Sequence, residues 1–139
     1  MIGIKNQKFG VEIEFTGITR REAATALADY FHTSVVYLGG GYDAWGVSDF
    51  TGQQWKIMSD GSIRGEQKAD AHYIRTGDRS YQVEFVTPVL RYEDMEIFQG
   101  AIRTLRHAGG KANNSCGLHV HVDAANHNRQ SLKNLMSIM

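Results

Sequence analysis

The chain has 139 residues, 42% of them hydrophobic, and its 15 Lys and Arg residues balance its 15 Asp and Glu residues to a formal net charge of zero. This composition is typical of one soluble globular domain, and a neutral chain has no long-range field to attract nucleic acid or an anionic membrane. The single cysteine excludes an internal disulfide framework, and no apolar run reaches the roughly 18 residues that span a bilayer. Because the N-terminal segment lacks the apolar stretch of a signal peptide, we expect a cytoplasmic protein.

The first half of the chain begins with a strongly alternating segment. Four apolar residues are separated by small or acidic ones over residues 9–15, and this period of two predicts a strand with one buried face. A capping-box pattern at residues 19–22 predicts a helix over residues 20–32. The β-branched segment 34–38 predicts a second strand, and the glycine-rich sequence of residues 39–54 predicts a long loop.

The middle of the chain predicts two more strands joined by a polar connection. Residues 53–58 predict a strand that ends at an Asp-Gly turn, and residues 81–90 predict another that closes near Pro88. Between these strands, residues 60–79 form a polar connection.

The last third predicts a helix, a strand and a second helical segment. Apolar residues at spacings of three and four predict a helix over residues 92–107, and Gly109 follows where a helix end favours a positive φ. Alternation predicts a strand over residues 116–124, and residues 129–139 have a helical pattern without a stop signal. Together the segments predict an α+β fold, in which a mainly antiparallel curved sheet has helices on its apolar face and an open opposite face.

Metal-ligand side chains gather at the polar positions of three predicted strands: Glu12, Glu14, Glu84, His119 and His121. Residues i and i+2 of a strand lie about 6.6 Å apart, so two such carboxylates can serve two cations or two points around one polyphosphate. Clustered carboxylates repel one another and raise one another's pKa unless a cation neutralises them. The pattern therefore favours a cation site on the open face.

A simpler interpretation is that these residues form the solvated face of an antiparallel sheet. A solvated face usually mixes Lys, Arg, Ser and Thr with its acids, whereas these five positions are Glu or His, with Gln82 and Val86 flanking Glu84 on the same face. Carboxylates suit Mg²⁺ or Mn²⁺, while imidazoles suit Zn or Fe. A Zn or Fe metalloenzyme, either a hydrolase or a cupin-like protein using the His-x-His strand, therefore stays open, as does a non-catalytic binding module.

Four segments in this order resemble the amidoligase family: FGVEIEF at 9–15, WKIMSDGSI at 55–63, VEFVTPVL at 83–90 and CGLHVHVDA at 116–124. That family belongs to the carboxylate–amine ligase superfamily, with glutamine synthetase and glutamate–cysteine ligase. The resemblance implies an ATP-dependent ligase that joins a small-molecule or peptide carboxylate to an amine through an acyl phosphate. It also implies part of a glutamine synthetase-like catalytic domain, with ATP and Mg²⁺ or Mn²⁺ as cofactors.

The resemblance also assigns roles to individual residues. It implies metal binding by the two first-strand acids, the acid of the EFVTP segment and one histidine of the HVH segment: Glu12, Glu14, Glu84 and His119. It implies catalytic roles for Glu14, Glu84 and His119, and contacts to nucleotide or substrate for Glu12 and His121. Asp60 matches a position that is expected to bind the metal cofactor or the substrate. No nucleic-acid or membrane partner is implied.

The family pattern is expected to continue past residue 139 with further basic and acidic residues. We therefore expect residues 1–139 to form a single domain that is the N-terminal part of a longer catalytic domain, weakly active or inactive by itself. Apolar surface at residues 129–139 would then favour self-association into a homo-oligomer.

Overall fold

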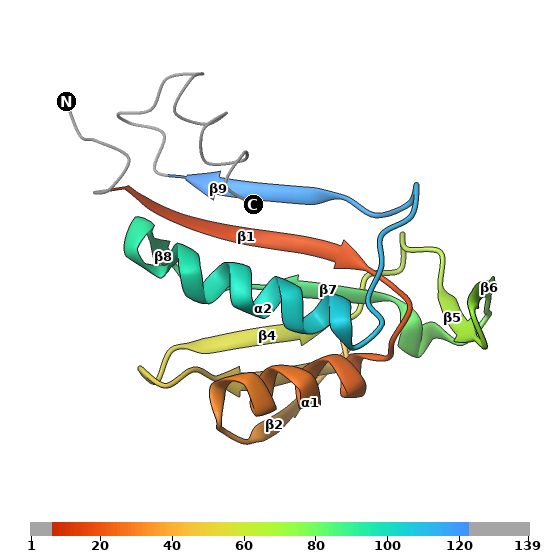
Figure 1. Cartoon of the computed structure of the whole chain (residues 1–139), viewed down its shortest axis with the longest axis horizontal. Coiled ribbons are helices and arrows are strands. Elements are labelled where there is room, and N and C mark those ends of the chain that lie inside the picture. The colour runs from red at the N-terminus through yellow and green to blue at the C-terminus, as the bar shows by residue number, and fades with distance from the viewer. Residues whose placement is uncertain (1–6, 123–139) are drawn as a thin grey trace.

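The computed structural model describes residues 7–122. Over this part of the chain, seven strands form one antiparallel sheet and two short strands form a separate hairpin (Figure 1). The helices are α1 (Arg20–Phe31) and α2 (Met95–His107), with the 3₁₀ turns Arg79–Tyr81 and Tyr92–Asp94. The strands are β1 (Lys8–Phe15), β2 (Val35–Gly39), β3 (Ala44–Ser48), β4 (Gln54–Met58), β5 (Glu66–Ala69), β6 (His72–Arg75), β7 (Val83–Val86), β8 (Leu90–Arg91) and β9 (Leu118–Val122).

Strand β1 lies inside the sheet and pairs with three other strands. Its second half pairs with β7 and its first two residues with β8, while residues 9–13 pair with β9. Phe9 is opposite both Leu90 of β8 and Val122 of β9. Strand β9 therefore lies along one edge of β1, and β7 and β8 lie along the other edge. The sheet continues from β7 through β4 and β3 to β2, and it is not closed on itself.

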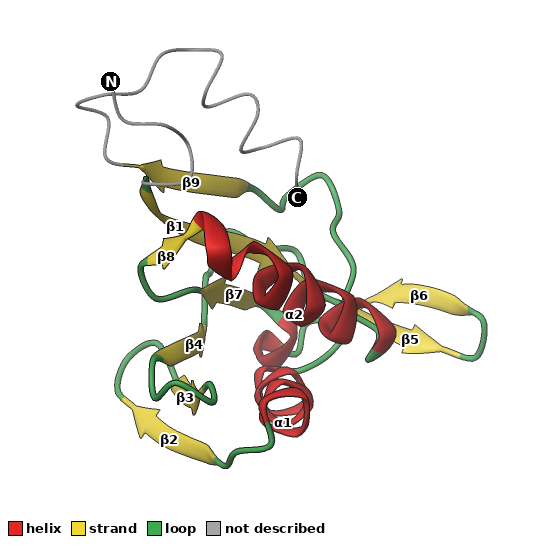
Figure 2. Ribbon diagram, turned by 60° about the vertical axis from the view of Figure 1, so that its left-hand side comes forward, coloured by secondary structure: helices red, strands yellow, loops and turns green. Residues whose placement is uncertain are grey.

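Both helices cover the same face of the sheet, as the sequence predicts (Figure 2). Thr19 and Glu22 form the predicted capping box at the start of α1, and Gly109, with φ of 112°, follows the end of α2. The helices approach closely at Gly100, where an added Cβ would collide with the Tyr30 hydroxyl, which donates a hydrogen bond to the Ile97 carbonyl. The α+β arrangement with helices on one face is therefore confirmed.

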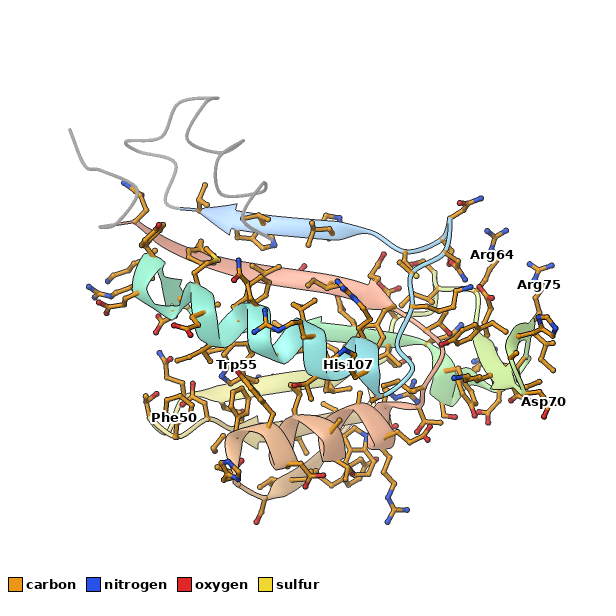
Figure 3. The ribbon with its side chains drawn as sticks, in the orientation of Figure 1. Phe50, Trp55, Arg64, Asp70, Arg75 and His107 are labelled. Atoms are coloured by element: carbon orange, nitrogen blue, oxygen red, sulfur yellow. The ribbon has the colours of Figure 1, made fainter. Side chains whose placement is uncertain are left out.

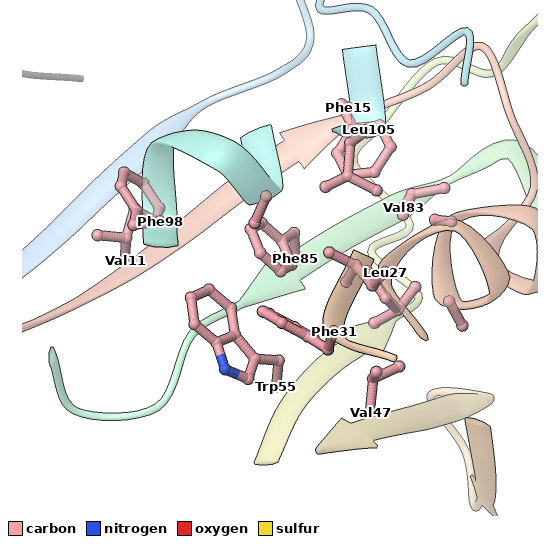
Figure 4. Packing of buried hydrophobic residues seen from close by; sticks show 14 of the residues in the cluster. Val11, Phe15, Leu27, Phe31, Val47, Trp55, Val83, Phe85, Phe98 and Leu105 are labelled. Atoms are coloured by element: carbon pink, nitrogen blue, oxygen red, sulfur yellow. The ribbon is translucent and has the colours of Figure 1, made fainter. Parts of the chain in front are cut away.

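The core lies between this face and the two helices (Figure 4). Trp55 of β4 stacks on Phe85 of β7, with ring centroids 5.6 Å apart, and contacts Phe31 of α1 at 5.2 Å. All three side chains are fully buried. Burying each such side chain stabilises the fold by about 1.5–3 kcal/mol, so this layer fixes the open face on the reverse side of the same strands.

One carboxylate is buried within this region and serves the structure. Asp49 is 5% exposed and accepts hydrogen bonds from the Thr51 amide and hydroxyl and from the Gln53 amide. Its second oxygen accepts from Trp55 Nε1 at 2.9 Å. Burial by itself raises the pKa of Asp49, but these hydrogen bonds outweigh it and the pKa lies below its ordinary value.

The predicted long loop over residues 39–54 is wrong in its centre, where strand β3 pairs with both β2 and β4. Gly46 lies within this strand, and an added Cβ there would lie 2.7 Å from the side-chain Nε2 of Gln54 and 3.3 Å from the side chain of Leu38. Side chains from the neighbouring strands therefore occupy the space that Gly46 leaves. Glycine marks close packing at this position and not a loop.

The polar connection over residues 60–79 contains a feature that the sequence did not predict, the β5–β6 hairpin. The hairpin is joined to the rest of the molecule through Glu66, whose carbonyl accepts from the Gly17 amide and the Thr16 hydroxyl. The Glu66 carboxylate binds Lys111 at 3.1 Å and Asn113 at 2.6 Å. These distant partners stabilise strands that have little hydrophobic alternation of their own.

The remaining predicted elements are present with small differences in length. The strand predicted over residues 81–90 is divided into β7 and β8, and the helix predicted from Tyr92 begins with a 3₁₀ turn. The helical segment predicted over residues 129–139 lies outside the described residues. None of the helices found in residues 7–122 has the length and apolar character needed to cross a membrane.

We predict that Asp49→Asn lowers the free energy of unfolding by about 1–3 kcal/mol at neutral pH, because an amide cannot accept all four hydrogen bonds. Since the Asp49 pKa is lowered in the fold, its contribution is present above the unfolded-state pKa and is lost as the pH falls through the folded-state value. Urea unfolding from pH 7 to pH 3 measures this. Asp70→Asn, at an exposed position with φ of 55°, is the control, and equal stability of the two variants would contradict the assigned role.

Candidate functional site

The open face of the sheet is the reverse side of the core strands. Because side chains alternate along β1, burial of Phe9, Val11 and Phe15 beneath the helices directs Glu12 and Glu14 to the opposite face. Pairing then fixes their neighbours, since Glu14 is opposite Glu84 and Glu12 is opposite His119. Directly opposed residues of antiparallel strands share a face. Side chains from three strands therefore meet on this face.

Three carboxylates come together there: Glu14, Asp60 and Glu84, which we call the carboxylate cluster. One oxygen of each lies within 4.8 Å of the others. Asp60 follows β4, whose last residue, Met58, pairs with Glu84. Asp60 Oδ1 accepts hydrogen bonds from the Ser62 amide at 2.9 Å and from the Ser62 hydroxyl at 2.7 Å. These bonds hold Asp60 in a turn beside the other two carboxylates.

Glu14 is the most deeply placed member of the carboxylate cluster, at 8% exposure. Its Oε1 accepts a hydrogen bond from the Gly117 amide at 2.6 Å, and the Glu14 amide donates to the Gly117 carbonyl at 3.0 Å. An added Cβ on Gly117 would lie 3.0 Å from the Glu14 carboxylate. The segment before β9 therefore closes against Glu14 through backbone groups alone.

The electrostatics of the carboxylate cluster favour positive charge. A hydrogen bond with Asp60 raises the pKa of Glu14, with burial adding to the effect, and the same hydrogen bond lowers the pKa of Asp60. Burial raises the pKa of Glu84, and the negative charges of Glu12, Asp60 and Glu14 raise it further. The cluster thus retains protons more strongly than separate acids would, and a cation can take the place of those protons.

A second group lies beside the carboxylate cluster on the same face. Glu12 Oε2 is 3.4 Å from His121 Nε2 and 3.8 Å from His119 Nδ1, distances that make ion pairs when the imidazoles are protonated. Both imidazoles are more than half exposed. A positive charge on His119 has a smaller effect, which lowers the pKa of each member of the carboxylate cluster, so His119 lies within electrostatic reach of it.

The six residues singled out from the sequence therefore fall into two neighbouring groups. Glu14 and Glu84 meet Asp60, whereas Glu12 and His119, predicted as metal ligands with them, lie with His121. The sequence indicated metal or substrate binding for Asp60, but Asp60 was not among the four predicted metal ligands. Its position in an Asp-Gly-Ser turn directly after a strand was the available signal.

The sequence also did not predict one backbone contact in the site and the position of one basic side chain. The Gly117 amide has no signature in the sequence, because its contact with Glu14 joins residues 103 positions apart. Lys56 and Met58 are two positions apart on β4 and therefore share a face, and Lys56 is opposite Val86, so Lys56 lies on the open face. The two-residue spacing within the predicted strand could have indicated this position.

We predict that Glu84→Gln raises the free energy of unfolding of the metal-free protein at pH 7. The Glu84 pKa is raised in the fold, so the fold favours the protonated side chain. The stability that protonated Glu84 contributes is complete below the unfolded-state pKa near 4.5 and is lost as the pH rises through the folded-state pKa, where Glu84 becomes ionised. The difference between variant and wild type should therefore shrink towards pH 4. Urea unfolding with a chelator present measures it, with exposed Glu93→Gln as the control. A Glu84→Gln protein that is less stable at pH 7 would refute the electrostatic description.

Comparison of the sequence with known protein families identifies the family of this chain. A family model described as "putative amidoligase enzyme" matches residues 5–139, which includes every strand and both helices described above. No curated protein matches the sequence. The match extends over nearly the whole chain and agrees with the resemblance carried by the four segments on β1, β4, β7 and β9. The chain belongs to the amidoligase family.

Proposed function

We propose that this protein is an ATP- and divalent-cation-dependent carboxylate–amine ligase. In the first step a substrate carboxylate oxygen attacks the γ-phosphorus of ATP, the bond to the β,γ-bridging oxygen breaks, and an acyl phosphate and ADP result. In the second step an amine attacks the acyl carbon, the bond to the phosphate oxygen breaks, and the amine loses a proton. The products are an amide, ADP and phosphate.

The carboxylate cluster fits a hard divalent cation. Glu14, Asp60 and Glu84 each offer one oxygen within 4.8 Å of the others, and oxygen ligands suit Mg²⁺ or Mn²⁺. When bound, such a cation neutralises the ATP phosphates and stabilises the charge that develops during phosphoryl transfer. The Gly117 amide and the Ser62 groups orient Glu14 and Asp60 for this role.

Glu12, His119 and His121 serve the phosphates in this proposal. Both imidazoles are exposed beside the carboxylate cluster, and an imidazole N–H can donate a hydrogen bond to a phosphate oxygen. Glu12 Oε2 forms ion pairs with the imidazoles when they are protonated and holds them on the open face. Removing either imidazole would weaken nucleotide binding without dismantling the cation site.

The observation that carries the proposal is the set of three carboxylates on the open face of an amidoligase-family chain. Within residues 7–122, no Lys or Arg side chain forms an ion pair with Glu14, Asp60 or Glu84. This set also favours the ligase over the Zn or Fe alternative. In the same part of the chain, the metal-ligand side chains close enough to share one ion are all carboxylates, and the two histidines are not among them.

We predict that the protein binds ADP in a Mg²⁺-dependent manner, and that Glu14→Gln, Asp60→Asn or Glu84→Gln weakens that binding on the order of tenfold to a hundredfold. Even the partners that orient metal ligands have effects of this size. Isothermal titration calorimetry with ADP, with and without Mg²⁺, measures the affinity.

Glu93→Gln and Asp70→Asn, which remove exposed carboxylates outside the open face, are the matched controls and should leave the affinity unchanged. ADP binding that does not respond to Mg²⁺ would contradict the proposal. Stoichiometric Zn²⁺ binding that is lost in His119→Ala but retained in Glu84→Gln would instead establish the metalloenzyme alternative.

A further inference from the structure

A positively charged cleft lies next to the carboxylate cluster. It has a volume of about 560 Å³ and is lined by residues 61–65, residues 75–79 and Gln82. Three of these residues are Arg64, Arg75 and Arg79, and we call the cavity the arginine cleft. Its size is within the range of about 300–1,000 Å³ that is usual for small-ligand sites. The chain as a whole is neutral, so this charge is a local feature.

In the described part of the chain, the guanidinium groups of the arginine cleft form no ion pair and no hydrogen bond. Arg20 and Lys111, in contrast, each form an ion pair with a carboxylate, at 2.9 Å and 3.1 Å. The Glu66 carboxylate is already bound by Asn113 and Lys111, which lower its pKa, and the positive charge of Arg64 helps to lower that pKa further. The acidic residue of the cleft, Asp78, accepts hydrogen bonds from the Ser80 amide and hydroxyl and forms no ion pair. The cleft therefore keeps an excess of positive charge that an anion can neutralise.

The backbone that carries two of these arginines is held firmly, although their side chains are exposed. The Arg64 amide donates to the Ser115 hydroxyl at 2.8 Å, and the Arg64 carbonyl accepts from the Asn113 side chain at 2.9 Å. Across the hairpin, the Thr76 amide donates to the Gly65 carbonyl at 3.0 Å. Arg64 and Arg75 also share the lining of a second cavity of about 430 Å³, and Figure 3 shows them side by side beyond the end of the sheet.

The arginine cleft begins where the carboxylate cluster ends. Its first lining residue, Gly61, directly follows Asp60, and Gln82, the residue before β7, precedes Glu84 by two positions. Gln82 Nε2 donates to the Ile63 carbonyl at 2.9 Å and thereby joins Gln82 to the lining segment 61–65. A ligand whose reacting group lies at the cluster can therefore extend directly into the cleft.

We infer that the arginine cleft binds a second carboxylate of the acid substrate, so that the substrate is a dicarboxylic acid or a peptide with an acidic side chain. This inference rests on the proposed ligase function, which places the reacting carboxylate at the cluster. Guanidinium groups bind carboxylates through two parallel hydrogen bonds, which distinguish a carboxylate from the amide of the same shape. The cleft thus selects the substrate and also directs which carboxylate reacts.

The test uses two probes that differ in one group, N-acetylglutamate with two carboxylates and N-acetylglutamine with one. Titration of the chain with each probe in the presence of Mg²⁺, followed by ¹H–¹⁵N NMR, gives both the affinity and the residues that respond. We expect N-acetylglutamate to bind about tenfold more tightly, which is the effect of one charge-assisted hydrogen-bond pair. The double variant Arg64→Gln/Arg75→Gln should lose this preference, and Arg103→Gln, at an exposed position of α2, should retain it.

Equal affinities for the two probes, or a preference that persists in the double variant, would overturn the inference. A double variant that binds Mg²⁺ and ADP less tightly but still prefers the dicarboxylate would also overturn it, because the arginines would then serve nucleotide phosphates. The ligase proposal fails separately: absence of Mg²⁺-dependent ADP binding refutes it even where the dicarboxylate preference is observed.

Discussion

The two-residue alternation of β1 is the constraint on which the rest of the molecule depends. Its apolar residues are fixed beneath α1 and α2, and its acidic residues must then occupy the opposite face. A one-residue shift of β1 against β7 would bury Glu14 in the core and expose Phe15, so the core enforces the register that brings Glu14 opposite Glu84. The hydrophobic layer in this way stabilises an arrangement of like charges that would not form by itself.

Opposite charges are separated along the open face and the hairpin. The carboxylate cluster concentrates negative charge at one end of β7, and the arginine cleft concentrates positive charge just beyond it, although the whole chain is neutral. A cation at the cluster and an anion in the cleft would each remove a local imbalance. The proposed ATP-dependent ligase would bind both kinds of group, since its nucleotide needs a cation and its acid substrate is an anion.

The strands that the sequence did not predict have a common physical origin. Strand β3 contains glycine because Gln54 and Leu38 fill the space beside Gly46, and strands β5 and β6 are polar because they are held by Thr16, Lys111 and Asn113. In each case partners distant in the sequence replace the hydrophobic alternation on which local prediction relies. The helices and the core strands were predicted correctly because capping residues and apolar periodicity act over a few neighbouring positions.

The sequence by itself determined the two helices, the apolar faces of the core strands and the kinds of side chain on their polar faces, since these follow from local spacing. Only the tertiary structure decided how those side chains are grouped. It joined Glu14 and Glu84 to Asp60, placed Glu12 with His119 and His121, and set the Gly117 amide against Glu14. Strand register and turn geometry determine such contacts, and they arise from pairing between segments far apart in the chain.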